Sequence, residues 1–373
     1  MPAKTRVLVL SPDFPPSRGG IQQLLERVIR DARRLEPRVV TMATPGDADF
    51  DARQPYVVRR VAWLPRSRRL SFLWLNAVAV WEARRARPSV VLSGHIVTGL
   101  AARALKRLWR IPTVQYLHAD EVRAAPRLAA FTLRGATAVV VVSRHTAEIA
   151  RAAGVDAGRI HLIPPGVDLP TEVDLRRDGP PTLLTVARLE DEYKGHDVVL
   201  QTLTSIREGV PDVTWTVVGE GSLRPRLEAL AAQYGVEAQV RFLGDLSDEE
   251  RDRWYRSAHV FVMPSRLPPG GGGEGFGIVY LEAAAHGLPV VAGNVAGARD
   301  AVVDGETGLL VDPTDHLEVA AAVTRLLLDE DLRMRLGQRG FERAAGYAWA
   351  EIARRVEALV LELREPAQKS SPA

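Results

Sequence analysis

Short apolar runs rich in β-branched residues alternate with amphipathic helical stretches along almost the whole chain. In the first half the apolar runs occupy residues 6–11, 38–42, 89–93, 112–117 and 138–143, and helical stretches include 20–35 and 98–109. Apolar runs of this length, separated by helices, indicate parallel strands that are covered on both faces. The sequence therefore predicts an α/β fold.

The alternation stops once, at the proline-rich segment "IPPGVDLPTEVDLRRDGPP" over residues 163–181. It resumes with apolar runs at 182–187, 213–219, 239–244, 259–263, 289–293 and 308–312. Such a break predicts two Rossmann-like, doubly wound domains that face each other across a cleft, where a ligand would bind. The expected division is 1–168, 169–345, a helix at 346–364 that crosses back to the first domain, and a disordered tail at 365–373.

Composition removes several classes of protein. The 373 residues include no cysteine, which excludes disulfides and Cys-ligated zinc and fits a reducing cytoplasm. No run approaches the ~18 apolar residues that a membrane span needs, and the N-terminal stretch lacks the pattern of a signal peptide. We expect a cytoplasmic protein, or one that lies on a membrane without crossing it.

A dinucleotide-dependent dehydrogenase is the first alternative for such a fold. Its G-x-G-x-x-G fingerprint should lie between a strand and the next helix. The nearest stretch, "VVGEGSLR", has Arg224 where the third glycine belongs, and no P-loop pattern occurs in the chain. Hydride transfer is therefore disfavoured.

Two basic residues follow the first strand of the second half, in "VARLEDEYKGHD". Arg188 and Lys194 would lie at the carboxyl edge of the sheet, where ligands of such folds bind. Fixed cations at that edge suit a departing diphosphate, because they stabilise the negative charge that develops on it. The alternative is that both are surface residues near the start of a helix.

The stretch "GEGFGIVYLEAAAHGLPVV" combines a glycine loop with two carboxylates. It predicts a short helix from about Gly277 to His286, a left-handed C-cap at Gly287 and then a buried strand. Glycines before a helix leave its first N–H groups open to an anion. Glu274 and Glu282 would repel an anion, so we expect them to face sugar hydroxyls instead.

Two further positions in the first half are candidates. Gly19 and Gly20 form either a turn or a second N–H cradle for the same diphosphate. His118 ends an apolar strand and is placed to contact a substrate, whereas His95 and His145 are interpreted as structural. The acids after His118 are also candidate metal ligands, but no second cluster of ligands supports a metal site.

The charge of the chain is unevenly distributed, although its net value is only +3. Residues 53–110 hold 13 basic residues, the single acid Glu82 and four of the seven tryptophans. Residues 71–87 predict an amphipathic helix that ends in arginines, as in an interfacial membrane anchor. We therefore expect docking on an anionic membrane, which exchange of Arg66, Arg68 and Arg69 for Glu would abolish. The alternative is that the tryptophans pack in the core, and no motif for reading nucleic acid is present.

Taken together, these motifs resemble those of the family 4 retaining glycosyltransferases, which have the GT-B fold of two Rossmann-like domains. The segments that carry the resemblance are "DFPPSRGGIQ", "VSRHTAE", "IPPGVD", "VARLEDEYKG", "VVGEG" and "EGFGIVYLEAAAHGLPVVA", in this order. They cover nearly the whole chain and are most similar to the actinobacterial phosphatidylinositol-mannoside mannosyltransferases.

The resemblance assigns a role to each candidate. Glu274 and Glu282 match the family's paired glutamates, the first on the hydroxyls of the donor sugar and the second on the ribose. Arg188 and Lys194 match the basic pair on the diphosphate, and His118 matches the histidine near the transferred sugar. The remaining donor-binding positions implied by the resemblance are Gly19, Gly20, Phe276, Gly277 and Ile278.

The resemblance also implies a reaction. A hexose, expected to be mannose from GDP-mannose, would move with retention to a lipid-linked or glycan acceptor such as a phosphatidylinositol mannoside, on the inner face of the cell membrane. The protein would bind no metal or other cofactor, with Mg²⁺ left open as a companion of the diphosphate. The alternatives are UDP-glucose or UDP-N-acetylglucosamine with a soluble or polysaccharide acceptor, a GT-B epimerase, and a non-catalytic sugar-nucleotide-binding protein.

Overall fold

The computed structural model describes residues 4–17, 19–65 and 67–364. The chain forms two compact units, one made of residues 1–166 and 349–373 and the other of residues 167–348. The first unit is therefore completed by the C-terminal helix α15 (Trp349–Arg364), which packs against α1 (Gly20–Asp31). The expected tail, 365–373, lies outside the described residues.

The first unit is built on a parallel sheet. Within the described residues its seven strands follow the order β3-β2-β1-β4-β5-β6-β7. The strands are β1 (Thr5–Leu10), β2 (Leu35–Met42), β3 (Val57–Val61), β4 (Val90–Ser93), β5 (Thr113–Leu117), β6 (Ala138–Val141) and β7 (Ile160–Leu162). The order reverses direction beside β1, as expected for a doubly wound sheet.

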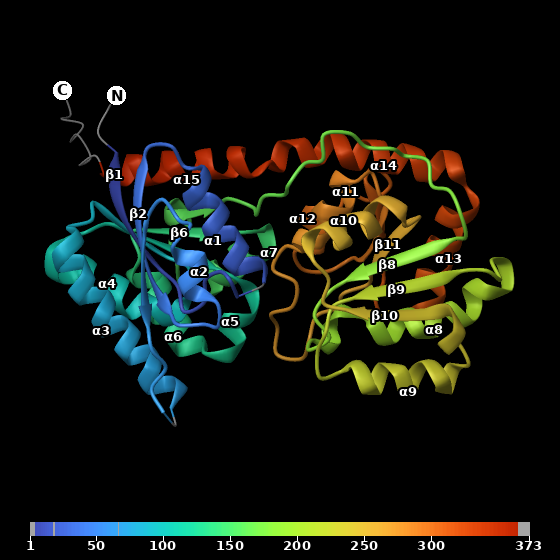
Figure 1. The fold of residues 1–373 in the computed structure, drawn as a ribbon, viewed down its shortest axis with the longest axis horizontal. Coiled ribbons are helices and arrows are strands. Elements are labelled where there is room, and N and C mark those ends of the chain that lie inside the picture. The colour runs from blue at the N-terminus through green and yellow to red at the C-terminus, as the bar shows by residue number, and fades with distance from the viewer. Residues whose placement is uncertain (1–3, 18, 66, 365–373) are drawn as a thin grey trace. The chain divides into compact units, whose positions relative to one another are not determined.

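Helices cover both faces of this sheet (Figure 1). On one face α3 (Arg68–Ala86), α4 (Gly99–Trp109) and α6 (Pro126–Gly135) pack side by side, and α1 and α15 pack together on the other. The shorter helices are α2 (Asp47–Asp51), η1 (Ile96–Thr98), α5 (Ala119–Ala124), α7 (Arg144–Ala152) and η2 (Ala157–Arg159).

The second unit repeats this architecture with, in its described part, a six-stranded parallel sheet in the order β10-β9-β8-β11-β12-β13. Its strands are β8 (Thr182–Val186), β9 (Thr214–Val218), β10 (Val240–Gly244), β11 (Val260–Met263), β12 (Val290–Gly293) and β13 (Gly308–Val311). Its helices are η3 (Glu192–Lys194), α8 (His196–Gly209), α9 (Arg224–Tyr234), η4 (Glu237–Gln239), α10 (Asp248–Ser257), α11 (Ile278–Ala285), α12 (Ala298–Ala301), α13 (His316–Leu328), α14 (Glu330–Ala344) and η5 (Ala345–Tyr347).

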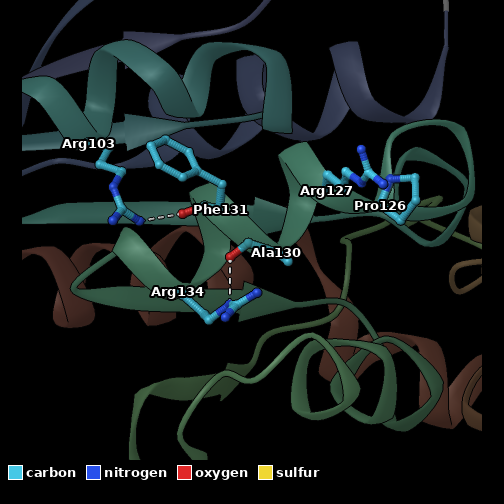
Figure 2. A pocket seen from close by; sticks show the side chains of 6 residues that line it. All are labelled: Arg103, Pro126, Arg127, Ala130, Phe131 and Arg134. Atoms are coloured by element: carbon cyan, nitrogen blue, oxygen red, sulfur yellow. Dashed lines mark hydrogen bonds between the residues drawn. The ribbon is translucent and has the colours of Figure 1, made fainter.

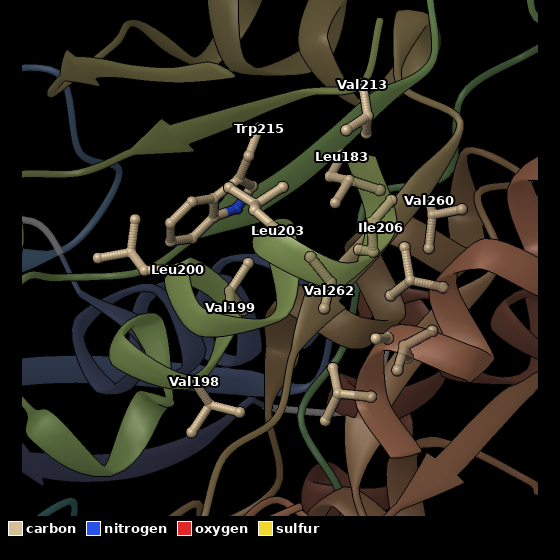
Figure 3. Packing of buried hydrophobic residues seen from close by; sticks show 14 of the residues in the cluster. Leu183, Val198, Val199, Leu200, Leu203, Ile206, Val213, Trp215, Val260 and Val262 are labelled. Carbon is tan, nitrogen blue, oxygen red and sulfur yellow. The ribbon is translucent and has the colours of Figure 1, made fainter. Parts of the chain in front are cut away.

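One face of the second sheet forms a closely packed core with α8, α9 and α13 (Figure 3). Trp215 is fully buried there, and its indole N–H donates to the Thr185 hydroxyl at 2.9 Å. This hydrogen bond satisfies the indole N–H, which would otherwise be buried without a partner.

The predicted α/β class and the parallel sheets are confirmed, but some local boundaries differ. The helix expected over 20–35 ends at Asp31, because Leu35 already pairs with Thr5 as the first residue of β2. The strands β3 and β7 were not expected. Both are edge strands with short or polar sequences, so they carry little of the continuous apolar signal of the central strands.

Candidate active site

The glycine loop leads directly into α11, as predicted. All four glycines at 270–273 have positive φ, and the N-cap Gly277 has φ 89°. A Cβ on Gly277 would lie 2.3 Å from Cδ2 of Tyr280, so only glycine fits. The helix begins without a side-chain cap or an acid in its first turn, which leaves its N-terminal N–H groups available to an anion.

Lys194 and Glu274 lie together although they are 80 residues apart. The Lys194 Nζ donates to Glu274 Oε2 at 2.5 Å, and the two side chains are only 13% and 12% exposed. Lys194 ends η3, just after β8, and Glu274 lies in the loop between β11 and α11. The structure thus brings a cation and a carboxylate together beside the start of α11.

The backbone of the loop fixes the position of Glu274. Its carbonyl accepts a hydrogen bond from the Gly297 N–H at 3.0 Å. A Cβ at Gly297 would lie 2.2 Å from the carbonyl oxygen of Gly275, so these two backbone segments approach as closely as only glycine permits. The backbone at Glu274 is therefore tied to Gly297, the residue that precedes α12.

Glu282 has a partner that the sequence did not suggest. The Tyr255 hydroxyl on α10 donates to Glu282 Oε2 at 2.7 Å, and an Arg251 nitrogen lies 4.0 Å from Oε1. Burial, followed by the charge of Glu282, raises the pKa of Tyr255 far above its usual value, so the hydroxyl stays protonated and donates. One carboxylate oxygen is thereby oriented, and the other lies at the limit of ion-pair distance from Arg251.

Arg188 and Phe276 lie in different surroundings from the Lys194–Glu274 ion pair. The Arg188 guanidinium is 72% exposed and contacts Asp191 at 3.2 Å, so it is free to turn toward a ligand. The Phe276 side chain is buried, with its ring 6.0 Å from that of Tyr347. Phe276 and Ile278 thus flank the Gly277 turn, and their contribution to a ligand would come from backbone N–H groups.

In the first unit, Gly19 is the N-cap of α1 with φ 153°, and Gly20 is the first residue of that helix. The helix has no side-chain cap and no acid in its first turn. A Cβ at Gly19 would meet the end of the Gln22 side chain at 2.4 Å. This helix start thus has the same open character as that of α11.

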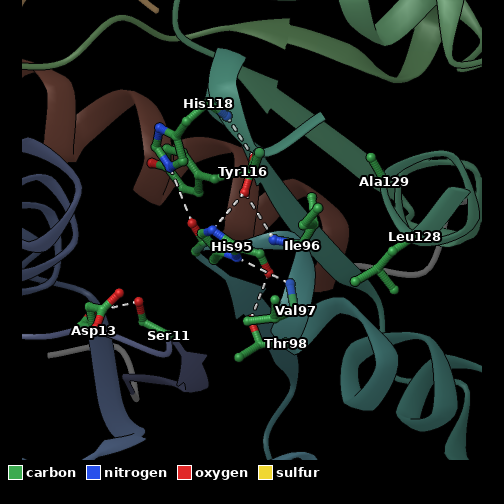
Figure 4. A network of polar contacts seen from close by, with 12 residues as sticks. Ser11, Asp13, His95, Ile96, Val97, Thr98, Tyr116, His118, Leu128 and Ala129 are labelled. Carbon is green, nitrogen blue, oxygen red and sulfur yellow. Dashed lines mark hydrogen bonds and ion pairs between the residues drawn. The ribbon is translucent and has the colours of Figure 1, made fainter. Parts of the chain in front are cut away.

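His118 caps α5, directly after β5 (Figure 4). Its Nε2 lies 3.1 Å from the Gly94 carbonyl oxygen, and its ring stacks on Tyr116 with centroids 6.0 Å apart. Burial lowers the pKa of His118 to about 4. The ring is therefore neutral at pH 7, donates through Nε2–H to Gly94, and keeps a lone pair on Nδ1.

A buried carboxyl behind His118 was missed as part of the site. Glu121 accepts from the backbone N–H of His118 at 2.8 Å and of Ile96 at 3.1 Å, which joins the turns that follow β5 and β4. Its Oε2 lies 3.4 Å from Nε2 of His95. Burial raises the pKa of Glu121 to about 8 and lowers that of His95 to about 4. The available signal was the capping pattern, a glutamate three residues after the N-cap.

Among the described residues, no three His, Cys, Asp or Glu side chains are grouped so that they could hold a metal ion. No helix in that part of the chain is both long and apolar enough to cross a bilayer.

Comparison with known proteins identifies the family. Residues 18–170 match the family model described as Glycosyltransferase Family 4, and residues 171–343 match the model described as Glycosyl transferases group 1. The chain is a family 4 glycosyltransferase. This confirms the resemblance and the prediction of an enzyme that transfers a hexose.

Two curated relatives of this glycosyltransferase have different activities. It is 32% identical to a GDP-mannose-dependent alpha-(1-6)-phosphatidylinositol monomannoside mannosyltransferase of Mycolicibacterium smegmatis, over 92% of this chain and 93% of the relative. It is 30% identical to a D-inositol 3-phosphate glycosyltransferase of Corynebacterium efficiens, over 73% and 71% of the two chains.

Solved structures share the fold. Sucrose-phosphate synthase from Thermosynechococcus elongatus superposes with a TM-score of 0.82 at 23% identity, covering 96% of this glycosyltransferase and 99% of that chain. Anabaena HepE in complex with UDP-glucose gives a TM-score of 0.76 at 20% identity, covering 96% and 99%. These matches confirm the expected GT-B fold.

Proposed function

We propose that this glycosyltransferase moves a hexose from a nucleotide diphosphate sugar, with mannose from GDP-mannose as the first candidate, to a lipid-linked acceptor such as a phosphatidylinositol mannoside. The observation that carries the donor part is the contact of Lys194 with Glu274 beside the start of α11. A diphosphate requires cations and N–H donors. The sugar attached to it requires acceptors, such as a carboxylate, for the hydrogen bonds that its hydroxyls donate.

In the proposed reaction, Lys194 and Arg188 stabilise the charge that develops on the departing diphosphate. Glu274 positions the sugar through its hydroxyls, while Glu282, held by Tyr255, binds the ribose. The acceptor attacks the face that the diphosphate leaves, and the departing phosphate oxygen takes its proton, so the configuration is retained. Catalysis then depends on positioning and charge stabilisation, with Mg²⁺ accompanying the diphosphate as an option to be tested.

The mannolipid assignment is supported by the M. smegmatis relative, which matches almost full length. The alternative, a UDP-glucose or UDP-N-acetylglucosamine donor with a soluble acceptor, is favoured by the fold shared with HepE, which was solved with UDP-glucose. Donor hydrolysis by the purified protein should be measured with GDP-mannose, UDP-glucose and UDP-N-acetylglucosamine. Preference for GDP-mannose, and faster turnover with phosphatidylinositol mannoside vesicles than with inositol phosphate, would support the proposal; preference for a UDP-sugar with a soluble acceptor would overturn it.

The proposed membrane contact involves α3. The four tryptophans of the basic region are half-exposed rather than buried in the core: Trp63 41%, Trp74 49%, Trp81 45% and Trp109 40%. The helix starts at Arg68, earlier than expected, and has apolar residues on two sides rather than one. One side packs in the core through Leu75 and Ala79, while Leu70 and Leu73 are more than half exposed.

An exposed apolar helix start flanked by arginines suits an anionic bilayer surface, here the cytoplasmic leaflet. Arg68 and Arg69 are both exposed, and Arg66 lies outside the described residues. The variant Arg68→Glu/Arg69→Glu should lose ~2 kcal/mol of attraction, about 30-fold in vesicle affinity. Arg325→Glu/Arg335→Glu, with the same charge change at exposed sites of the other unit, is the matched control.

Co-sedimentation with phosphatidylinositol-containing vesicles at low salt measures this loss. Equal sedimentation of the α3 variant and the parent would refute docking through α3 and favour a soluble acceptor. Donor hydrolysis should be unchanged in both variants, because no donor-site residue is altered.

A further inference from the structure

A groove of about 530 Å³ runs along the exposed side of α6 (Figure 2). Its lining residues are Arg103 from α4 and Pro126, Arg127, Ala130, Phe131 and Arg134 from α6. The α6 positions recur at helical spacing, so they form one continuous stripe along this helix. None of the six is acidic, and none belongs to the candidate donor site.

The floor of the groove is apolar and its rim is cationic. The Phe131 ring is 47% exposed, and the Arg103 guanidinium lies 4.0 Å from its centroid, which holds both groups in place. Pro126 and Ala130 extend the apolar surface along the helix. A ligand that covers Phe131 would therefore gain apolar contact beside a fixed positive charge.

The arginines at the rim lack anionic partners. Within the described part of the chain, no carboxylate lies within ion-pair distance of Arg103, Arg127 or Arg134. Arg103 donates to the Phe131 carbonyl and Arg134 to the Ala130 carbonyl, which uses only part of the five N–H donors of each guanidinium. Most donors at the rim are free for an anion.

Two more cations lie at the C-terminal end of α6. Lys106 donates to the Gly135 carbonyl at 3.0 Å, and Arg159 donates to the Arg134 carbonyl at 3.1 Å. Burial, and then the charges of Arg159 and Arg103, lower the pKa of Lys106 below its usual value. The C-terminal end of α6 is thus surrounded by cations.

We propose that this groove binds a single anionic phospholipid, with the phosphate on Arg127 and Arg134 and the start of an acyl chain over Phe131. The charge and the apolar floor together favour an amphiphile, since a free phosphate would leave Phe131 uncovered. The inference takes its ligand class from the proposed membrane acceptor, and α3, α4 and α6 cover the same face of the sheet. The groove is nevertheless separate in sequence and in helix from the exposed start of α3.

Calorimetry with monomeric dihexanoylphosphatidic acid, below its micelle concentration and without bilayers, tests the groove alone. We expect saturable binding to the full chain. Dihexanoylphosphatidylcholine, which is zwitterionic, and glycerol 3-phosphate, which lacks acyl chains, should bind at least about tenfold more weakly. Equal binding of glycerol 3-phosphate, or absence of binding by the phosphatidic acid, would overturn the proposal.

The variants separate charge from apolar contact. Binding of the phosphatidic acid should weaken by about tenfold or more in Arg127→Glu/Arg134→Glu and, independently, in Phe131→Ala. Phe131→Leu should keep most of the affinity that Phe131→Ala loses. Arg325→Glu/Arg335→Glu should bind as the parent does. All of these side chains are exposed, so the fold should survive.

The groove and the docking of α3 on a membrane can fail independently of each other. If Arg68→Glu/Arg69→Glu sediments with vesicles as the parent does and still binds the monomeric lipid, docking through α3 is wrong and the groove stands. If the groove variants bind the monomeric lipid like the parent, the groove is wrong even where vesicle docking through α3 holds.

Discussion

Replacing Lys194 with methionine tests whether the buried pair with Glu274 both supports the second unit and serves the donor. The substitution keeps most of the side-chain volume but removes the charge 2.5 Å from Glu274 Oε2. Loss of one partner from a buried pair typically costs 3–5 kcal/mol. We expect about 3 kcal/mol, since both side chains keep some exposure.

The contrast with Arg188 makes the prediction specific. Arg188 is 72% exposed and, among the described residues, pairs only with Asp191, so Arg188→Ala should change stability by no more than ~0.5 kcal/mol. Turnover should nonetheless fall by ~10²-fold or more in either variant, because each would lose a cation that stabilises the departing diphosphate in the proposed reaction. Stability and turnover thus separate at Arg188 and fall together at Lys194.

The double variant Lys194→Met/Glu274→Gln should recover most of the lost stability, to within about 1 kcal/mol of the parent, because no uncompensated charge remains. Turnover should stay low. Hydrogen exchange of the β8 and β11 amides in increasing urea measures the stability of the second unit alone, and donor hydrolysis measures turnover. A cost below about 1 kcal/mol for Lys194→Met would refute the energetic argument, and near-normal turnover in both single variants would refute the leaving-group role.

Three further predictions concern other parts of the two units. Glu282→Gln should weaken binding of GDP or UDP in calorimetry, whereas Glu274→Gln should lower turnover more than affinity; equal losses of affinity would contradict this division of roles. Gly277→Ala should abolish nucleotide binding and destabilise the second unit by ~1–3 kcal/mol, since its φ of 89° is strained for alanine and the Cβ meets a ring. Gly271→Ala, with φ 84° and nothing within 4 Å of its Cβ, carries the same backbone strain and should keep nucleotide binding. For Glu121, whose pKa is raised to about 8, the folded state holds a proton that the unfolded state loses near pH 4.5, so the stability of the parent relative to Glu121→Gln should fall as pH rises from 4.5 to 8. Hydrogen exchange of the β5 amides measures this difference in stability. A difference that stays constant between pH 4.5 and 8 would show that the pKa of Glu121 is not raised.

Much of the architecture could be predicted because the signals are local. Continuous apolar runs specify buried parallel strands within a few residues, and a glycine before and after an apolar turn specifies where α11 starts and ends. The structure has α11 at Ile278–Ala285 and a left-handed Gly287. Edge strands such as β3 were not predicted, because a strand that pairs with one neighbour needs a less apolar sequence.

The sequence by itself determined the two parallel α/β sheets and the residue types available for a donor site. Only the tertiary structure decided which of these residues meet. Lys194 pairs with Glu274 across 80 residues, Tyr255 orients Glu282 from another helix, and Glu121 joins two separate turns behind His118. Backbone conformation is set by neighbours along the chain, whereas a side chain's charge partner and exposure are set by packing through space, which no spacing in the sequence records.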